Sequence, residues 1–295
     1  MKTLRLSLLI AFTLVFAVFS CGDDSSDNGG TGTGTGTGSG TGTGTSTTAG
    51  IVVDHTCTSL SSIPSSWITT VKNSIKLHYA HTSHGEQLTG GLTRIEEHNS
   101  TYNVEIGDMF LPAVANALCI FNGQKDETYI TPDLFWQTHE GMERTRDVLK
   151  SNPTINVCMW CWCTQLDDWG QEQVQEYLDS MSALEREFPK VKFVYFTGNA
   201  QQQDYAGYNR NNNNNQIRRF CSNNKKNLFD FEDLDCWWFN PATNAWEQAT
   251  YNYNGNTVPY QHPHFDGDEN GHTTWESCEQ KGNAVWWLLA KLAGW

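Results

Sequence analysis

The chain has 295 residues and a formal net charge of −14, with 33 acidic side chains against 19 basic ones. This balance and the lack of a basic patch in the sequence argue against nucleic acid as a partner. The length is sufficient for one sizeable α/β domain.

The first residues predict an export signal. Lys2 and Arg5 precede an apolar run, residues 6–19, that is too short for a stable transmembrane helix. The run ends in Ser20-Cys21, and this junction resembles the lipobox of bacterial lipoproteins. The resemblance implies a signal peptide over residues 1–20, lipidation of Cys21 and attachment to a membrane through the lipid. The alternative is an ordinary secretory signal with an unmodified cysteine.

Residues 21–50 predict a flexible Thr/Gly-rich tether. The repeat contains no large apolar side chain and therefore cannot build a core. The acidic residues after Cys21 resemble the surface-export signals of some bacterial lipoproteins. We expect a protein of the cell envelope, anchored at the outer membrane or the cell surface, with one domain over residues 51–295.

Apolar runs alternate with helical patterns along this domain. The predicted strands are residues 75–80, 102–106, 155–163, 192–197 and 227–231. The predicted helices are residues 86–97, 139–150, 171–188, 213–223 and 282–292. Short connections imply βα units, and the pattern predicts a three-layer α/β/α sandwich with a mainly parallel, flavodoxin-like sheet of about five strands. Residues 209–216 predict an Asn-rich loop, and residues 236–264 a long excursion near the top of the sheet.

The turn after the first of these strands has the sequence His81-Thr82-Ser83-His84-Gly85. A strand that feeds a tight turn into a helix places a hydroxyl beside N–H groups at the helix N-terminus, where negative charge is stabilised. This arrangement predicts Ser83 as a nucleophile, and a helix N-cap is the alternative. We expect His81 and His84 to pack or to contact substrate, because sequence neighbours of a nucleophile rarely act as its base.

Polar residues also follow other predicted strands, where ligand and catalytic groups of parallel sheets gather. Gln165 follows the third strand and Asn199 the fourth. A loop before the last helix carries Asp268, Glu269 and His272. An imidazole oriented by one of these carboxylates could take the proton of a serine hydroxyl.

In the order of its elements and motifs, the chain over residues 72–295 resembles the SGNH (GDSL-type) hydrolases. The resemblance implies that Ser83, in a His-x-Ser-x-Gly variant of the family motif, is the nucleophile. It implies an oxyanion hole formed by Gly107 and Gln165 with the backbone of Ser83. Asn199 is predicted to contact substrate because of its place after the fourth strand.

The same resemblance implies that His272 is the base of a Ser-His-Asp/Glu mechanism. The family spacing puts Glu269 at the acid position, with Asp268 one residue earlier. The implied function is hydrolysis of an ester, such as an acyl group on a carbohydrate, without a required cofactor.

Two metal hypotheses use the same C-terminal loop. Asp266, Asp268 and Asn270 match the beginning of a calcium loop, so a structural calcium ion is one hypothesis. His262, His264 and Asp266 are similar to a motif of metallo-β-lactamase-like hydrolases, which is the zinc alternative.

Aromatic residues and cysteines complete the candidates. Trp237 and Trp238 are two of twelve tryptophans and lie in the aromatic excursion, where their rings could stack on a glycan. A non-catalytic glycan-binding surface lipoprotein on a degenerate hydrolase scaffold is therefore the alternative function. Nine cysteines less Cys21 leave an even number, which suggests disulfides in an exported protein, with Cys236–Cys278 as one candidate bridge.

The lipobox-like junction makes a prediction that can be tested directly. Mass spectrometry of the native N-terminus should find an acylated Cys21 and no residue of the 1–20 segment. The Cys21→Ala variant should pass into the soluble fraction, because one acidic domain without a lipid has nothing to hold it to a bilayer. An intact Ser20–Cys21 bond, or cleavage elsewhere, would contradict the anchor.

Overall fold

The computed structural model describes residues 49–295, which belong to one compact unit, Thr47–Trp295. The predicted signal peptide, Cys21 and nearly all of the predicted tether lie outside the described residues. Within residues 49–295, no helix combines the length and the apolar character needed to cross a membrane.

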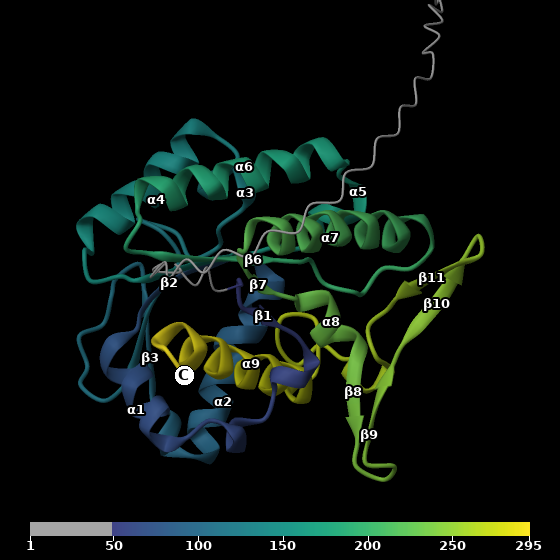
Figure 1. Ribbon diagram of the computed structural model, residues 1–295, viewed down its shortest axis with the longest axis horizontal. Helices are drawn as coiled ribbons and strands as arrows, with labels where there is room; N and C mark the ends of the chain where they lie inside the picture. The colour runs from purple at the N-terminus through teal and green to yellow at the C-terminus, as the bar shows by residue number, and fades with distance from the viewer. Residues whose placement is uncertain (1–48) are drawn as a thin grey trace, which may run out of the picture. The chain divides into compact units, whose positions relative to one another are not determined.

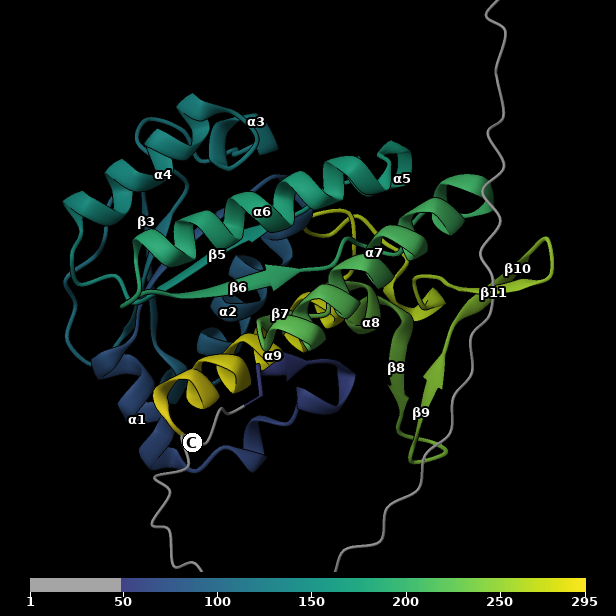
Figure 2. The same cartoon turned by 45° about the horizontal axis from the view of Figure 1, so that its top comes forward.

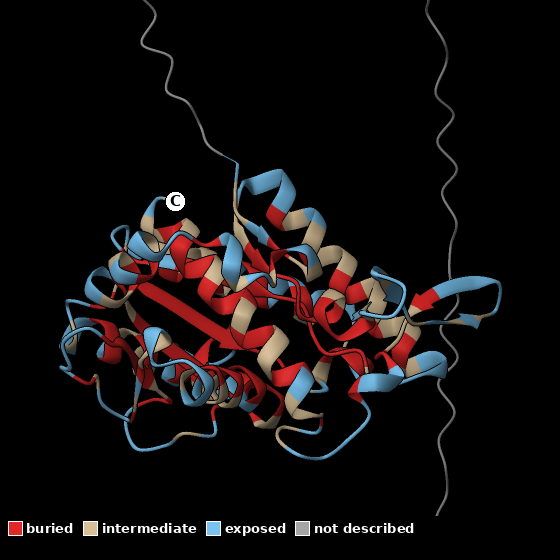
Figure 3. Cartoon of the chain, turned by 90° about the horizontal axis from the view of Figure 1, so that it is seen from below, coloured by how far each residue is buried: buried red, intermediate tan, exposed pale blue. Residues whose placement is uncertain are grey.

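Residues 49–295 build a seven-stranded, fully parallel sheet in the order β1-β7-β6-β5-β2-β4-β3 (Figure 1). The strands are β1 (Val52–Val53), β2 (Lys76–His81), β3 (Val104–Asp108), β4 (Leu118–Asn122), β5 (Val157–Cys161), β6 (Lys192–Phe196) and β7 (Asn227–Phe229). The central strand β5 is buried along its whole length, because helices cover both faces of the sheet (Figure 3).

Two layers of helices enclose the sheet (Figures 1 and 2). One layer contains α1 (Ser65–Ser74), α2 (Glu86–His98) and α9 (Trp275–Ala293). The other contains α3 (Pro132–Phe135), α4 (His139–Ser151), α5 (Gln165–Asp168), α6 (Gln171–Glu187) and α7 (Asp204–Asn224). The short helix α8 (Phe231–Cys236) follows β7. The prediction of a three-layer α/β/α sandwich is confirmed.

The long helices could be predicted from periodicity, because their buried residues follow the apolar spacing of the sequence. In α6 the buried residues are Val174, Tyr177, Leu178, Met181 and Leu184, which form one apolar stripe. The helix ends at Glu187, and the chain enters β6 after one short turn. Each predicted strand matches a strand of the sheet to within a few residues.

Two strands of the central sheet were not predicted, so this sheet has seven strands rather than about five. The first, β1, is very short and lies at the sheet edge beside β7. The second, β4, lies between β2 and β3 and is buried. Short apolar runs of this kind cannot be assigned from periodicity alone. The insertion of β4 moves β3 one strand further from β2.

The prediction of an Asn-rich loop over residues 209–216 is wrong, since these residues lie within α7. Asn has a low helix propensity, but tertiary hydrogen bonds hold the segment helical. The Asn213 amide donates to the carbonyl oxygens of Leu166 and Trp169, at 2.9 and 2.8 Å. The Asn214 Oδ1 atom accepts from the Gly198 N–H at 2.8 Å.

The predicted excursion over residues 236–264 contains two hairpins. They pair β8 (Trp237–Asn240) with β9 (Ala245–Gln248), and β10 (Thr250–Tyr253) with β11 (Asn256–Pro259). Both lie at the end of the sheet toward which β6 points (Figure 2). The excursion is therefore ordered and stands beside the carboxyl ends of the strands.

The disulfide prediction, including Cys236–Cys278, is wrong for the described residues, whose eight cysteines are all free. Seven of these eight thiols are buried, and the eighth, Cys163, is half-buried. Cys236 and Cys278 are fully buried and pack as small apolar side chains. An even cysteine count thus reflects core packing here.

The contact between α2 and α9 generates a stability prediction. A Cβ atom at Gly91 would lie 1.9 Å from the Cys278 carbonyl oxygen, so Gly91→Ala must push the two helices apart. We expect the free energy of unfolding to fall by about 1–3 kcal/mol in urea denaturation. The control Thr93→Ala, on the exposed side of α2, should change it by less than about 0.5 kcal/mol. An unchanged Gly91→Ala protein would contradict this packing.

Candidate functional site

The candidate site lies at the carboxyl ends of three neighbouring strands. The turn η3 (Ser83–Gly85) follows β2, Cys163 follows β5, and Gln201 belongs to the loop after β6. Because β2, β5 and β6 are adjacent and parallel, their carboxyl ends meet at one edge of the sheet. This edge brings a hydroxyl, an imidazole, a thiol and an amide together.

The central contact joins Cys163 to His84. The His84 Nδ1 atom lies 3.1 Å from the Cys163 sulfur, and its Nε2 atom lies 2.8 Å from the Gln201 Oε1 atom. The Gln201 amide group donates its own N–H to the His272 carbonyl oxygen, so Oε1 is the atom that faces His84. Nε2 of His84 therefore carries a proton, and Nδ1 is free to accept the proton of the thiol.

The electrostatics of this pair favour charge separation. Burial raises the pKa of Cys163, but the hydrogen bond and charge of His84, with a smaller effect of the Ser83 hydroxyl, outweigh it and lower that pKa to about 6. Burial lowers the pKa of His84, but the Cys163 thiolate outweighs it and leaves that pKa above its ordinary value. Both shifts point to a thiolate–imidazolium pair near neutral pH. Burial raises the pKa of Cys161, two positions earlier on the chain, and makes it inert by comparison.

Ser83, the predicted nucleophile, contacts the same sulfur. Its Oγ atom lies 3.5 Å from the Cys163 Sγ atom. Among the described residues, Cys163 is the hydrogen-bond partner of the Ser83 hydroxyl. No hydrogen bond among these residues joins the Ser83 hydroxyl to an imidazole. The hydroxyl is placed to donate a hydrogen bond to the thiolate.

His272 reaches the site through the loop before α9. A Cβ atom at Gly271 would lie 2.8 Å from the Ser83 carbonyl oxygen, so the loop packs against the Ser83 turn. The His272 ring lies 5.0 Å from the His84 ring, and its Nδ1 atom lies 3.5 Å from the Asp268 Oδ1 atom. His272 has a φ of 67°, in the left-handed region that non-glycine residues rarely adopt.

The two candidate carboxylates of this loop have different partners. Asp268 faces His272, and both side chains are exposed. The Glu269 carboxylate instead accepts the N–H of Trp275 at 2.7 Å, at the first residue of α9. Glu269 thus satisfies the helix N-terminus, and Asp268 is the carboxylate beside the imidazole.

Of Gly107 and Gln165, the two residues predicted to complete an oxyanion hole with Ser83, the structure brings Gln165 to the site. The Gln165 Oε1 atom accepts the Cys163 N–H at 2.8 Å, which fixes the amide beside the sulfur. Gly107 lies within β3, and β4 separates β3 from β2. At a strand spacing of about 4.8 Å, Gly107 is roughly 10 Å from β2, the strand that leads into the Ser83 turn.

His81 and Asn199, predicted to contact substrate, are both buried. The His81 ring bonds the Thr82 carbonyl oxygen and the Asn122 Oδ1 atom, at 2.8 and 2.9 Å. The Asn199 amide donates to the Cys163 carbonyl oxygen at 2.8 Å. Asn199 therefore supports the backbone that carries the thiol.

The two predicted glycan-contacting tryptophans pack on histidine rings. Trp237 stacks on His55 with ring centroids 4.4 Å apart, and Trp238 stacks on His264 at 3.6 Å. The Trp238 indole N–H also donates to the Glu276 carboxylate at 2.8 Å. These contacts fix the β8–β9 hairpin to the rest of the domain.

The three side chains predicted for a calcium site have separate protein partners. The Asp266 Oδ1 atom accepts from Gln261 at 3.2 Å, and the Asn270 amide donates to the Glu86 carbonyl oxygen at 3.0 Å. Asp268 lies beside an imidazole, as described above. The calcium ion stays a prediction.

One group of side chains among the described residues has the spacing of metal ligands. The donor atoms of Asp54, His55 and Asp233 lie within 4.8 Å of one another. The His55 Nδ1 atom and the His55 backbone N–H both lie 2.7 Å from Asp233 Oδ1, so hydrogen bonds account for much of this arrangement. The histidines of the zinc hypothesis, His262 and His264, lie stacked beside each other at 5.5 Å.

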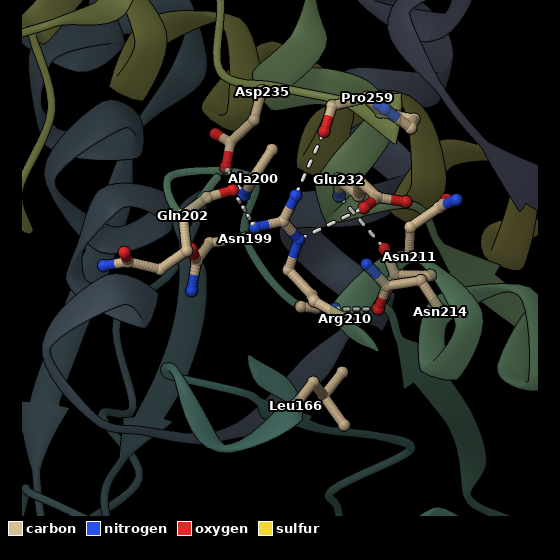
Figure 4. A network of polar contacts seen from close by, with 12 residues as sticks. Leu166, Asn199, Ala200, Gln202, Arg210, Asn211, Asn214, Glu232, Asp235 and Pro259 are labelled. Atoms are coloured by element: carbon tan, nitrogen blue, oxygen red, sulfur yellow. Dashed lines mark hydrogen bonds and ion pairs between the residues drawn. The ribbon is translucent and has the colours of Figure 1, made fainter. Parts of the chain in front are cut away.

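A buried guanidinium holds the loop that presents Gln201 (Figure 4). Arg210 is fully buried and donates to the carbonyl oxygens of Gln202 and Pro259, both at 3.0 Å. Its Nε atom lies 3.2 Å from the carboxylate of Glu232, which is also fully buried. This pairing ties the loop after β6 to α7, α8 and β11.

Two further bonds fix the same loop (Figure 4). The Ala200 N–H donates to the Asp235 carboxylate at 2.9 Å, and the Gly198 N–H donates to Asn214. Asp235 in turn pairs with the buried Lys281 at 2.7 Å. The loop is therefore held on both sides of Gln201, and His84 receives a fixed partner.

Comparison of the chain with models of protein families and with curated proteins finds no match. The functional interpretation therefore depends on the geometry of the site.

Cys163 and Gln201 are the site residues that sequence reasoning missed. The predicted strand over residues 155–163 ends at Cys163. Its place at the carboxyl end of a predicted strand was the available signal, because catalytic groups of parallel sheets gather there. Gln201 stands in a run of three glutamines, and nothing in the sequence distinguishes it from Gln202 or Gln203.

The thiolate–imidazolium pair predicts the pH dependence of alkylation. Cys163 should react with iodoacetamide at a rate that rises with pH around a midpoint of about 6, because its thiolate forms above that pH. In His84→Ala the midpoint should move above the ordinary cysteine value of about 8.5, since burial then acts unopposed. The Cys163→Ser protein supplies the blank. A wild-type midpoint near 8.5 would contradict the pair.

Proposed function

We propose that this chain is a hydrolase of acyl esters and that the Cys163 thiolate is its nucleophile. The observation that supports the proposal is the chain of contacts from the Cys163 sulfur through His84 to Gln201. A nucleophile, a base within hydrogen-bond reach and a group that orients the base are the recurring parts of covalent acyl transfer. Export and attachment through Cys21 remain part of the proposal.

The reaction follows from this geometry in two halves. The thiolate of Cys163 attacks the ester carbonyl carbon, and the carbonyl electron pair moves onto oxygen. As this pair returns, the bond to the alkoxy oxygen breaks, and the His84 imidazolium gives that oxygen its Nδ1 proton. An alcohol leaves and a thioester remains on Cys163. Water then attacks the thioester while Nδ1 of His84 takes one proton of the water. A carboxylic acid is released, and the thiolate–imidazolium pair is restored.

Donors for the developing oxyanion are available beside the sulfur. The N–H groups of Ser83 and His84 open the helical segment that leads into α2 and have no intrahelical acceptor, whereas those of Gly85 and Glu86 already donate to carbonyl oxygens of the turn. The Gln165 Oε1 atom is occupied by the Cys163 N–H, which leaves its Nε2 group to donate. Such donors each contribute roughly 3–4 kcal/mol to comparable reactions.

A serine mechanism of the SGNH type is the second candidate. The His272–Asp268 pair supports it, because the loop that carries this pair packs against the Ser83 turn. In that mechanism Ser83 attacks and His272 is the base. In the thiol mechanism Ser83 stabilises the thiolate, and His272 stands at the solvent side of the site.

One set of variants separates the candidates. With 4-nitrophenyl acetate, Cys163→Ala and His84→Ala should each lose at least about 10²-fold in kcat/KM, because nucleophile and base act as a unit. Ser83→Ala should keep activity within about tenfold and shift its pH profile upward, because the thiolate loses a hydrogen-bond donor. Cys57→Ser, which removes a buried thiol elsewhere, is the control.

The opposite pattern would make Ser83 the nucleophile. If Ser83→Ala abolishes turnover and Cys163→Ala does not, the thiol mechanism is wrong. If the wild-type protein cleaves neither 4-nitrophenyl acetate nor an acetylated glycan, the non-catalytic glycan-binding alternative is favoured.

A further inference from the structure

A cavity of about 590 Å³ lies apart from the thiol site, between the β8–β9 hairpin, the segment of Thr56, Thr58 and Ser59, and α9. Its volume falls within the roughly 300–1,000 Å³ that small-molecule pockets occupy. The hairpin and α9 are neighbours in the structure (Figure 1). The three walls differ in chemistry, and this difference indicates what the cavity could hold.

The hairpin supplies an aromatic wall. Phe239 and Trp246 are directly opposite in the β8–β9 pairing, so their side chains share one face of the hairpin. Their ring centroids lie 5.4 Å apart at an angle of 71°. Phe239 is 40% exposed, although burial of a phenylalanine ring is favourable. The wall is therefore an apolar surface that is open to a ligand.

The helix α9 supplies a polar wall. Glu276, Glu279 and Asn283 follow one another at helical spacing along the face of α9 that lines the cavity. One oxygen of each carboxylate is held by the protein: Glu276 Oε1 accepts from Trp238, and Glu279 Oε1 accepts from Arg94 at 3.2 Å. Among the described residues, these bonds leave the second oxygen of each carboxylate free to accept from a ligand.

We propose that this cavity is a binding site for a neutral glycan whose pyranose rings carry equatorial hydroxyls. Such a ring has a flat face of C–H groups and a rim of hydroxyls. The C–H face can stack on one of the two rings, Phe239 or Trp246, which stand at 71° to each other, and the hydroxyls match the carboxylates and the Asn283 amide. Glu276, whose partner is the neutral indole N–H of Trp238, and the net charge of −14 repel uronic-acid polymers.

The inference extends the proposed function, because it names the class of substrate. Glu276 lies in the first turn of α9, directly after the loop that carries His272. Trp238 bonds Glu276 and stacks on His264 of the same loop. A glycan bound in the cavity would therefore be held beside the loop that packs against the Ser83 turn and carries His272 to the thiol site.

Isothermal titration calorimetry tests the binding without the hydrolysis. The Cys163→Ala protein is titrated with cellohexaose, xylohexaose and hexagalacturonate. We expect at least one neutral hexasaccharide to bind and the charged one not to bind. Trp246→Ala, in the same background, should weaken binding at least tenfold. Glu276→Gln, which keeps an acceptor oxygen for Trp238, should weaken binding as well.

Tyr205→Ala is the matched control, because Tyr205 is an exposed aromatic residue on α7 that does not line this cavity, and it should leave binding unchanged. The absence of heat with both neutral sugars, equal binding of hexagalacturonate, or an unchanged dissociation constant in both cavity variants would overturn the inference. Activity of the wild-type protein on 4-nitrophenyl acetate is measured separately, so failure of the glycan site is distinguishable from failure of the hydrolase proposal.

Discussion

The buried ion pair between Arg210 and Glu232 is the interaction on which the site depends. A buried guanidinium is tolerated only when its charge is paired and its donors are satisfied. Glu232 supplies the charge, and the carbonyl oxygens of Gln202 and Pro259 accept the remaining hydrogen bonds. Because the Gln202 carbonyl belongs to the loop after β6, satisfaction of the charge also fixes the position of Gln201. The acceptor that orients His84 is thus a consequence of core electrostatics.

The position of Cys163 relative to the sheet explains why this thiol differs from its neighbours. Cys158 and Cys161 lie within β5 and are enclosed by the core, where burial raises the pKa of each thiol. Cys163 comes just after the strand ends, where the backbone leaves the core and His84 is within reach. Two residues beyond the end of β5, the side chain therefore leaves the core and meets an imidazole that lowers its pKa.

If the proposed function holds, the two sites divide the tasks of a hydrolase that acts on a polymer. Covalent chemistry requires few groups, rigidly placed, and the carboxyl ends of β2, β5 and β6 provide them. Recognition of a chain of sugars requires a longer and more open surface, which the β8–β9 hairpin and α9 provide. The loop with His272 connects the two, since it packs on the Ser83 turn and leads into α9.

The sequence by itself determined the layered α/β architecture, the long helices and the edge of the sheet where polar groups gather. These features follow from local periodicity, as in the buried stripe of α6.

The tertiary structure decided what depends on contacts between distant residues. It inserted β4 between β2 and β3 and so separated Gly107 from Ser83, and it held an Asn-rich segment in helix α7. It also kept the described cysteines unpaired and brought Cys163, rather than an imidazole, into contact with the Ser83 hydroxyl. Residue spacing along a chain encodes which face a side chain occupies, whereas partners across the sheet are chosen by packing and by the need to satisfy buried charge.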